Sequence, residues 1–275
     1  MELEQRVVAH YSRGNLLAAM LEAVRAAGGD PDHPSEEALA ELGEFHTRGR
    51  EATAELGRAL ALAPGESVLD VGSGIGGPSR HLARAHGCHI TGIDLTEEYC
   101  RTATALAERL GLADRVAYRH GSALAMPFAD ASFDAAYTQH VAMNIADKPR
   151  LYAEIARVLK PGGRFGLYDL LQGPGGEPHY PVPWARDAAT SFLITPEALR
   201  DLLVQAGFAI LSWRDTGAEV RAWLDELRAH QRRGEAVASP LPVLFGADFP
   251  NIARNLARNL EEGRVVPAEV ICRRG

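Results

Sequence analysis

The stretch "SVLDVGSGIGGPSRHLA", residues Ser67–Ala83, joins a short apolar run to a helical pattern through a loop that holds four glycines. A strand followed by a glycine turn and a helix is the arrangement that brings bare backbone N–H groups close to a ligand. Pro78 suits the first turn of that helix, and Gly87 suits its C-terminal cap. Four glycines so close together lose backbone entropy on folding without adding packed side chains. The loop is therefore predicted to bind a ligand.

Short apolar runs and helical patterns alternate on both sides of this loop. We expect strands at residues 67–71, 89–95, 116–121, 133–141 and 164–170, with helices at 78–87, 96–111 and 149–161. This order is typical of parallel strands joined by right-handed helical crossovers, and hence of an α/β fold with a doubly wound sheet. In such a sheet the ligand lies at the carboxyl ends of the strands.

The two ends of the chain depart from this alternation. Residues 1–60 have helical spacings, with Ser35 as a plausible N-cap, and are predicted to form an N-terminal helical cap on a main domain of residues 61–275. A helix and a strand follow at about 197–217. Residues from about 218 to 263 are again helical and precede a last apolar run, "VVPAEVICRR". This helical insertion is expected to cover the site.

Composition narrows the classes of partner. The chain has 275 residues and a formal net charge of -7, which does not suit a surface that neutralises nucleic-acid phosphates. Its start carries Glu2, Glu4 and Arg6 rather than an apolar signal segment, so we expect a cytoplasmic protein with no membrane partner. The three cysteines are widely separated, which predicts buried thiols and no metal site.

The glycine loop by itself is compatible with a dinucleotide. Gly72, Gly74 and Gly77 fit the dinucleotide fingerprint, and Asp94 follows about 20 residues later, where a ribose-binding acid would stand. An NAD-dependent dehydrogenase is therefore one reading. Asp70, however, puts a carboxylate at the end of the first strand, where it would repel a pyrophosphate. It favours a cofactor with a cationic head and no phosphate.

Four motifs in order extend the comparison beyond the loop. "VLDVGSGIGG", "GIDL", "GSALAMPFADASFDAAYT" and "LKPGG" together resemble the motif set of class I S-adenosylmethionine-dependent methyltransferases. The resemblance covers about residues 60–275. It implies a Rossmann-like sheet of seven strands with an antiparallel last strand, and S-adenosylhomocysteine as a product. "FHTRGREATAEL", "TQHVAMNIADK" and "HYPVPW" resemble the small-molecule branch that contains sarcosine and dimethylglycine N-methyltransferases.

The resemblance also implies a set of cofactor contacts. Asp94 would accept both ribose hydroxyls through its two oxygens. Ser122 stands where the family commonly carries an aspartate that accepts from the adenine amino group, so the adenine contact is weaker there. The implied cofactor-binding residues are Asp70, Gly72, Ser73, Gly74, Gly76, Asp94, Leu95, Ser122, Ala123 and Gln139.

The chemistry is an in-line displacement at the methyl carbon, which depends mainly on alignment in a dry pocket. His140 follows the fourth strand and is predicted to position the acceptor or to take its proton, with an ordinary structural histidine as the alternative. Asn144 is a second polar candidate for the acceptor site. By resemblance to phosphoethanolamine methyltransferases, Tyr11 would close over the site as a further catalytic candidate.

The segment after the fifth strand indicates which class of methyl acceptor the protein binds. Tyr180 and Trp184 offer aromatic faces that hold a substituted ammonium, and Arg186 offers a cation for a carboxylate. These residues favour N-methylation of an amine of amino-acid type. O- or C-methylation of a phenol or quinone natural product is the alternative, and a module that only binds the cofactor is another. The acceptor, the number of methyl transfers and the oligomeric state stay open, with a homodimer as one option.

Overall fold

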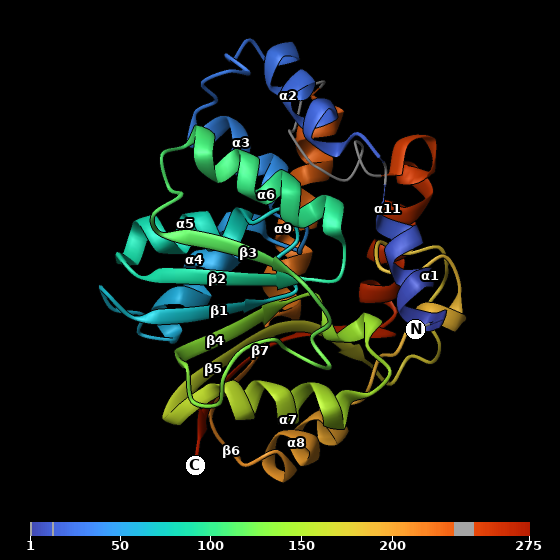
Figure 1. The fold of residues 1–275 in the computed structure, drawn as a ribbon. Coiled ribbons are helices and arrows are strands. Elements are labelled where there is room, and N and C mark those ends of the chain that lie inside the picture. Colours follow the sequence, from blue (N-terminus) through green and yellow to red (C-terminus); the bar gives the residue numbers. More distant parts are fainter. Residues whose placement is uncertain (1, 13, 234–244) are drawn as a thin grey trace.

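A computed structural model describes residues 2–12, 14–233 and 245–275 and shows a seven-stranded sheet flanked by helices (Figure 1). The strand order is β3-β2-β1-β4-β5-β7-β6, and β7 runs antiparallel to both of its neighbours. The strands are β1 (Ser67–Val71), β2 (His89–Asp94), β3 (Val116–His120), β4 (Phe133–Gln139), β5 (Leu159–Gln172), β6 (Phe208–Asp215) and β7 (Val265–Arg274). The predicted doubly wound sheet with an antiparallel last strand is confirmed.

The helices of the described residues fall into those that precede the sheet, those that connect its strands, and those near its end. The first group is α1 (Glu2–Tyr11), α2 (Leu16–Ala26), α3 (Glu36–Gly43) and α4 (Gly49–Ala59). The second is α5 (Gly77–His86), α6 (Glu97–Arg109), α7 (Lys148–Val158) and α8 (Pro196–Gln205). The third is α9 (Gly217–Arg232) and α11 (Phe249–Glu261), while short 3-10 turns lie at Ala142–Asn144, Ala188–Thr190 and Gly246–Asp248.

Two apolar layers hold the helices against the sheet. On one face, Leu56 of α4 and Leu82 of α5 pack on alternate residues of the central strands such as Val68. On the other face, Ile155 of α7 and Leu203 of α8 pack on the intervening residues. Because strand side chains alternate between faces, each central strand contributes to both layers. The strand ends, rather than the faces, are left for a ligand.

The site position follows from the strand order. β1 pairs in parallel with β2 on one side and with β4 on the other, so the chain direction of the crossovers reverses between β1 and β4. A crevice forms outside the carboxyl ends of the strands at such a switch point. The segment after each of these strands therefore faces one common space.

The helix ends follow local sequence, with two differences from expectation. Ser35 caps α3, because its Oγ accepts from the backbone N–H of Ala38, and Gly87 ends α5 in the left-handed conformation. α7 ends at Val158 and β5 begins at Leu159, earlier than expected from residue 164. The residue before a proline avoids helical backbone, so Lys160 before Pro161 favours the earlier end. Thr96 stands at the N-cap of α6, but its side chain makes no capping hydrogen bond.

Residues of α1, α2 and α3 share a buried cluster with the C-terminal α11 (Figure 1). Met20 of α2, Tyr99 of α6 and Ile252 of α11 share one buried cluster. Residues 234–244 of the predicted helical insertion lie outside the described residues. No helix in the described ranges is both long and apolar enough to cross a bilayer.

Candidate active site

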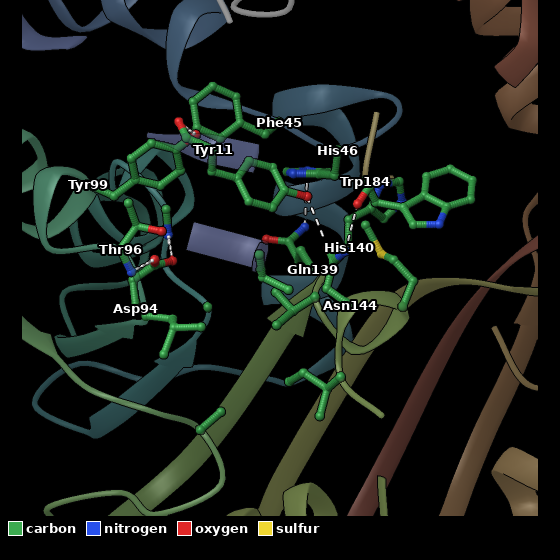
Figure 2. A pocket seen from close by; sticks show the side chains of 18 of the residues that line it. Tyr11, Phe45, His46, Asp94, Thr96, Tyr99, Gln139, His140, Asn144 and Trp184 are labelled. Atoms are coloured by element: carbon green, nitrogen blue, oxygen red, sulfur yellow. Dashed lines mark hydrogen bonds between the residues drawn. The ribbon is translucent and has the colours of Figure 1, made fainter. Parts of the chain in front are cut away.

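A cavity of about 560 Å³ lies beyond the carboxyl ends of β1, β2 and β4 (Figure 2). Its walls come from the loops after β1 and β3, the turn after β4, and Val7, Trp223 and Leu256 of α1, α9 and α11. Within the described part of the chain, its ionisable acids are Glu4, Asp94 and Asp147, and neither lysine nor arginine lines it. The cavity is therefore mostly apolar and has no fixed cation.

The four loop glycines have two different tasks. Gly72 and Gly74 line the cavity with left-handed backbone, at φ +77° and +53°. Gly76 instead faces Tyr118 of β3, whose hydroxyl a Cβ at this position would overlap. Gly77 lies against Gly43, so any side chain there would collide with the end of α3. Gly72 and Gly74 thus belong to the ligand cavity, and Gly76 and Gly77 to the packing of helices and sheet, while a Cβ at Gly72 would also overlap Val141.

Two of the predicted cofactor contacts, Ser73 and Gly76, do not line the cavity among the described residues. The Ser73 side chain turns toward β2, where a Cβ added at Gly92 would lie 2.6 Å from Ser73 Oγ. Ser73 Oγ is buried and has no hydrogen-bond partner within the described structure. The left-handed residues on both sides of Ser73 direct its side chain into the sheet.

Asp94, the last residue of β2, lines the cavity as predicted. Its Oδ2 accepts from the backbone N–H of Gly74 at 2.8 Å, and its Oδ1 accepts from that of Thr96 at 2.8 Å. Burial raises the pKa of this carboxyl. Each oxygen accepts a further bond, which suits a pair of ribose hydroxyls. Asp94 thus also joins the glycine loop to the start of α6.

Asp70, also predicted as a cofactor contact, is not among the described residues that line the cavity. It is 2% exposed, and its Oδ2 accepts from Ser79 Oγ at 2.5 Å and from Tyr137 Oη at 2.8 Å. Burial raises the pKa of Asp70 to about 7. Ser79 lies in α5 and Tyr137 in β4, so the carboxylate is held between helix and sheet.

The predicted adenine side lies along the loop after β3. Leu95, Ser122 and Ala123 all line the cavity. Ser122 Oγ accepts from the backbone N–H of Leu124 at 3.1 Å and donates to Glu4 Oε1 at 2.6 Å. Glu4 belongs to α1, more than a hundred residues away in sequence. The hydroxyl is thus already engaged on both its donor and acceptor sides.

A polar cluster lines the opposite side of the cavity (Figure 2). His46 Nε2 lies 3.0 Å from the Gly49 carbonyl oxygen and 3.1 Å from both Thr53 Oγ1 and Gln139 Nε2. Burial lowers the pKa of His46 to about 4, so its imidazole is neutral at physiological pH. Gln139 lines the cavity as predicted. His46 was missed as a site residue, although the stretch "FHTRGREATAEL" that contains it carried part of the family resemblance.

His140 lines the cavity in a conformation that local sequence does not favour. Its φ is +53°, which is unusual for a residue with a Cβ and is stabilised by a bond from its N–H to the Tyr168 carbonyl at 2.8 Å. Its ring stacks on Tyr168, and its Nε2 lies 3.3 Å from Thr47 Oγ1. Thr47 Oγ1 in turn lies 2.7 Å from Tyr168 Oη. Burial and the nearby His46 lower the pKa of His140 well below its usual value.

Tyr11 and Asn144 are joined across the cavity wall. Tyr11 Oη donates to Asn144 Oδ1 at 2.9 Å, and Asn144 Nδ2 donates to the Trp184 carbonyl at 2.7 Å. Burial, and to a lesser extent the charges of Asp94 and Asp169, raises the pKa of the Tyr11 hydroxyl. Asn144 therefore fastens α1 to the segment after β5. All three side chains line the cavity, as predicted.

Tyr180 and Arg186, predicted to contact the acceptor, do not line the cavity among the described residues. Tyr180 packs in an apolar cluster with Trp184. Arg186 Nη1 lies 3.1 Å from Asp248 Oδ2 on the surface. The segment after β5 is rich in glycine and proline and has no regular repeat. Residues close to Trp184 in sequence therefore need not face the cavity with it.

Comparison with known proteins identifies the family. Residues 69–167 match the methyltransferase domain family. An O-methyltransferase of Aspergillus sclerotiorum is 34% identical over 195 residues, which cover 69% of this chain and 70% of that protein. The chain is a class I S-adenosylmethionine-dependent methyltransferase.

Other relatives share smaller parts or only the fold of the methyltransferase. A sterol 24-C-methyltransferase of Gibberella zeae is 42% identical over 112 residues, covering 41% of this chain but only 30% of the sterol enzyme. A geranyl diphosphate C-methyltransferase of Streptomyces coelicolor superposes with a TM-score of 0.74 at 20% identity, covering 100% of this chain and 99% of that one.

The resemblance to the sarcosine and dimethylglycine branch is supported only as a fold. A Galdieria sulphuraria protein described as a sarcosine dimethylglycine methyltransferase has a TM-score of 0.71 but 19% identity, covering 94% of this chain and 98% of that one. The sequence relatives named above are instead an O-methyltransferase and a sterol C-methyltransferase. The finer placement in that branch is therefore not retained.

The cavity of the methyltransferase fits S-adenosylmethionine better than a dinucleotide. Gly72 and Gly74 leave space for close backbone approach, and Asp94 offers both oxygens to a diol. A pyrophosphate would meet no lysine or arginine among the described lining residues, whereas a cationic sulfonium meets no like charge there. The bound cofactor supplies an electrophilic methyl group, and the protein's residues orient it.

Proposed function

We propose that this methyltransferase transfers a methyl group to a hydroxyl oxygen of an apolar, uncharged small molecule of natural-product type. The observation that supports this most is the cavity wall, which combines apolar side chains with neutral imidazoles and, in the described residues, lacks lysine and arginine. Met143, Trp184, Trp223, Phe245 and Leu256 provide its large apolar surfaces. Apolar walls with a few convergent polar groups suit such an acceptor.

The same wall argues against an acceptor of amino-acid type. A carboxylate buried without a cationic partner carries a large desolvation cost. Arg186, the residue expected to pair with it, lies outside the cavity lining and is bound to Asp248. N-methylation of an amino acid therefore lacks the recognition group that it needs in the described residues, and hydroxyl methylation becomes the better reading.

A hydroxyl acceptor needs a base, and His140 is the candidate. As the acceptor oxygen bonds to the methyl carbon, the carbon–sulfur bond breaks and its electron pair stays on sulfur, giving S-adenosylhomocysteine. The hydroxyl proton passes to an imidazole nitrogen of His140. Stacking on Tyr168 and the contact with Thr47 orient the ring. Because burial holds the pKa of His140 below its usual value, the base is unprotonated near neutral pH without needing a carboxylate partner.

The test is methyl transfer from S-adenosylmethionine carrying a ¹³C methyl group. Acceptors are 1-naphthol and hydroquinone on one side, and glycine and sarcosine on the other, with products identified by NMR. We expect methyl on phenolic oxygen. Transfer to sarcosine nitrogen with both phenols inert would overturn the proposal, and so would methyl attached only to ring carbon.

The role of His140 is tested separately with His140→Gln. We expect kcat for 1-naphthol to fall by about 100-fold, with His89→Gln, on the exposed start of β2, as the matched control. The loss of kcat in His140→Gln should become smaller as the pH approaches the pKa of the phenol, about 10, because a phenolate needs no base. A deficit that is constant across pH would assign His140 a purely structural task.

A further inference from the structure

One face of α1 lies over the cavity. Leu3, Glu4, Val7 and Tyr11 line it, at the spacing that places residues on one side of a helix. Near the C-terminal end of α1, Tyr11 binds Asn144, and His10 Nε2 lies 3.1 Å from the Pro183 carbonyl. Near the N-terminal end, Glu4 meets Ser122. The helix therefore spans from Asn144 to the loop after β3.

Glu4 brings a carboxylate to a position where the β3 loop has none. Ser122 Oγ donates to Glu4 Oε1 at 2.6 Å, while the same Oγ accepts from the Leu124 N–H. The hydroxyl proton is thus committed to Glu4, and Ser122 serves to hold the carboxylate in place. Glu4 is half-buried and lines the cavity.

A ribose held by Asp94 would direct the cofactor's adenine toward this carboxylate. Asp94, at the end of β2, marks the ribose position, and Leu95, Gly121 and Ser122 line the cavity next to it on the β3 side. The base attached to that ribose would contact these residues. Its exocyclic amino group is a hydrogen-bond donor and requires an acceptor when it is taken out of water.

We propose that Glu4 is a cofactor-binding residue whose carboxylate accepts a hydrogen bond from the adenine amino group. Helix α1 would then help to select the base of the cofactor. The bond is charge-assisted and therefore stronger than one to a serine hydroxyl. Binding of the cofactor also holds α1 over the cavity, because the same helix carries Tyr11 to Asn144. The proposal rests on the cofactor of the family and not on the hydroxyl acceptor, so the two can fail independently.

The test compares binding of S-adenosylhomocysteine with that of S-inosylhomocysteine, in which a carbonyl replaces the amino group. Affinities are measured by calorimetry on the full chain, without an acceptor. The wild-type protein is expected to prefer the adenine ligand by tenfold or more, since a carboxylate repels a carbonyl oxygen. Glu4→Gln retains an acceptor for the Ser122 hydroxyl but presents an amide that also donates.

Glu4→Gln is expected to weaken the binding of S-adenosylhomocysteine by about tenfold. The affinity for S-inosylhomocysteine should stay unchanged or become tighter. Ser122→Asp in the Glu4→Gln background should restore the adenine preference, because it returns a carboxylate from the β3 loop. Arg6→Gln, on the exposed side of α1, is the matched control and should change neither affinity. Equal weakening of both ligands by Glu4→Gln, or no change in either, would overturn the proposal.

Discussion

Replacing Gly72 by alanine tests the packing of the glycine loop against the turn after β4. Gly72 has φ +77°, and an added Cβ would overlap Val141 Cγ2 and lie 2.6 Å from Val141 Cγ1. The left-handed backbone costs an alanine about 1–2 kcal/mol. Overpacking adds about 1–3 kcal/mol, because Val141 follows His140, whose N–H is bound to the Tyr168 carbonyl and restrains the turn. We expect Gly72→Ala to lower the free energy of unfolding by about 2–5 kcal/mol.

A matched glycine separates the two contributions. Gly65 has φ +79°, but nothing lies within 4 Å of an added Cβ. Gly65→Ala should therefore show only the backbone cost, about 1–2 kcal/mol. Adding Val141→Ala to Gly72→Ala removes both overlapping methyl groups, although the Val141 Cβ itself remains at 3.0 Å. That double variant should recover most of the difference between Gly72→Ala and Gly65→Ala.

The assay is urea unfolding of each variant without ligand, together with calorimetric binding of S-adenosylhomocysteine. Gly72→Ala should also weaken the ligand, since Gly72 lines the cavity, whereas Gly65→Ala should not. If Gly72→Ala and Gly65→Ala lower the free energy of unfolding by the same amount within about 0.5 kcal/mol, the close contact with Val141 adds nothing to the cost and the reasoning is wrong.

Two further predictions concern buried groups behind and across the cavity. The first compares the wild-type protein with Asp70→Asn. Because burial raises the pKa of Asp70, its carboxyl binds a proton more tightly in the folded than in the unfolded protein. Raising the pH from 3.8 toward 7 should therefore lower the wild-type free energy of unfolding relative to that of Asp70→Asn. The relative loss should approach about 4 kcal/mol in urea titrations at pH 4 and pH 8, and parallel pH profiles would contradict it. Tyr11→Phe removes the bond to Asn144 and should weaken docking of α1 by about 1 kcal/mol, seen as faster amide exchange in residues 2–11. Unchanged exchange there would show that the bond from Tyr11 to Asn144 does not hold the helix.

The elements of the sheet were predictable because their signals are local. Strands β1 and β2 are short apolar runs, and α5 and α6 carry their start and stop signals within a few residues of each end. Chain order then predicts parallel pairing through right-handed crossovers. Where the structure differs from these predictions, the difference covers only a few residues; β5, for example, begins at Leu159, before Pro161.

Site residues that directly follow a strand were also predictable. Gly72, Asp94, Gln139 and His140 stand at or just after the ends of β1, β2 and β4, and all line one cavity. Parallel strands place their carboxyl ends at one edge of the sheet, so position along the chain is enough to bring these residues together. Asp70 lies only two residues from Gly72 but inside the strand, where its side chain binds α5 and β4.

The sequence alone thus determined the doubly wound sheet and the edge at which the cavity lies, because periodicity, caps and glycine turns act over a few residues. Tertiary structure alone decided which distant side chains complete the site. Glu4 reaches Ser122 from α1, and His46 reaches Gln139 from the segment before α4. Side-chain orientation within the loop, as at Ser73, was likewise set by packing on Gly92. Such contacts depend on how helices pack over the strand ends, and no local pattern specifies which of their side chains will face the cavity.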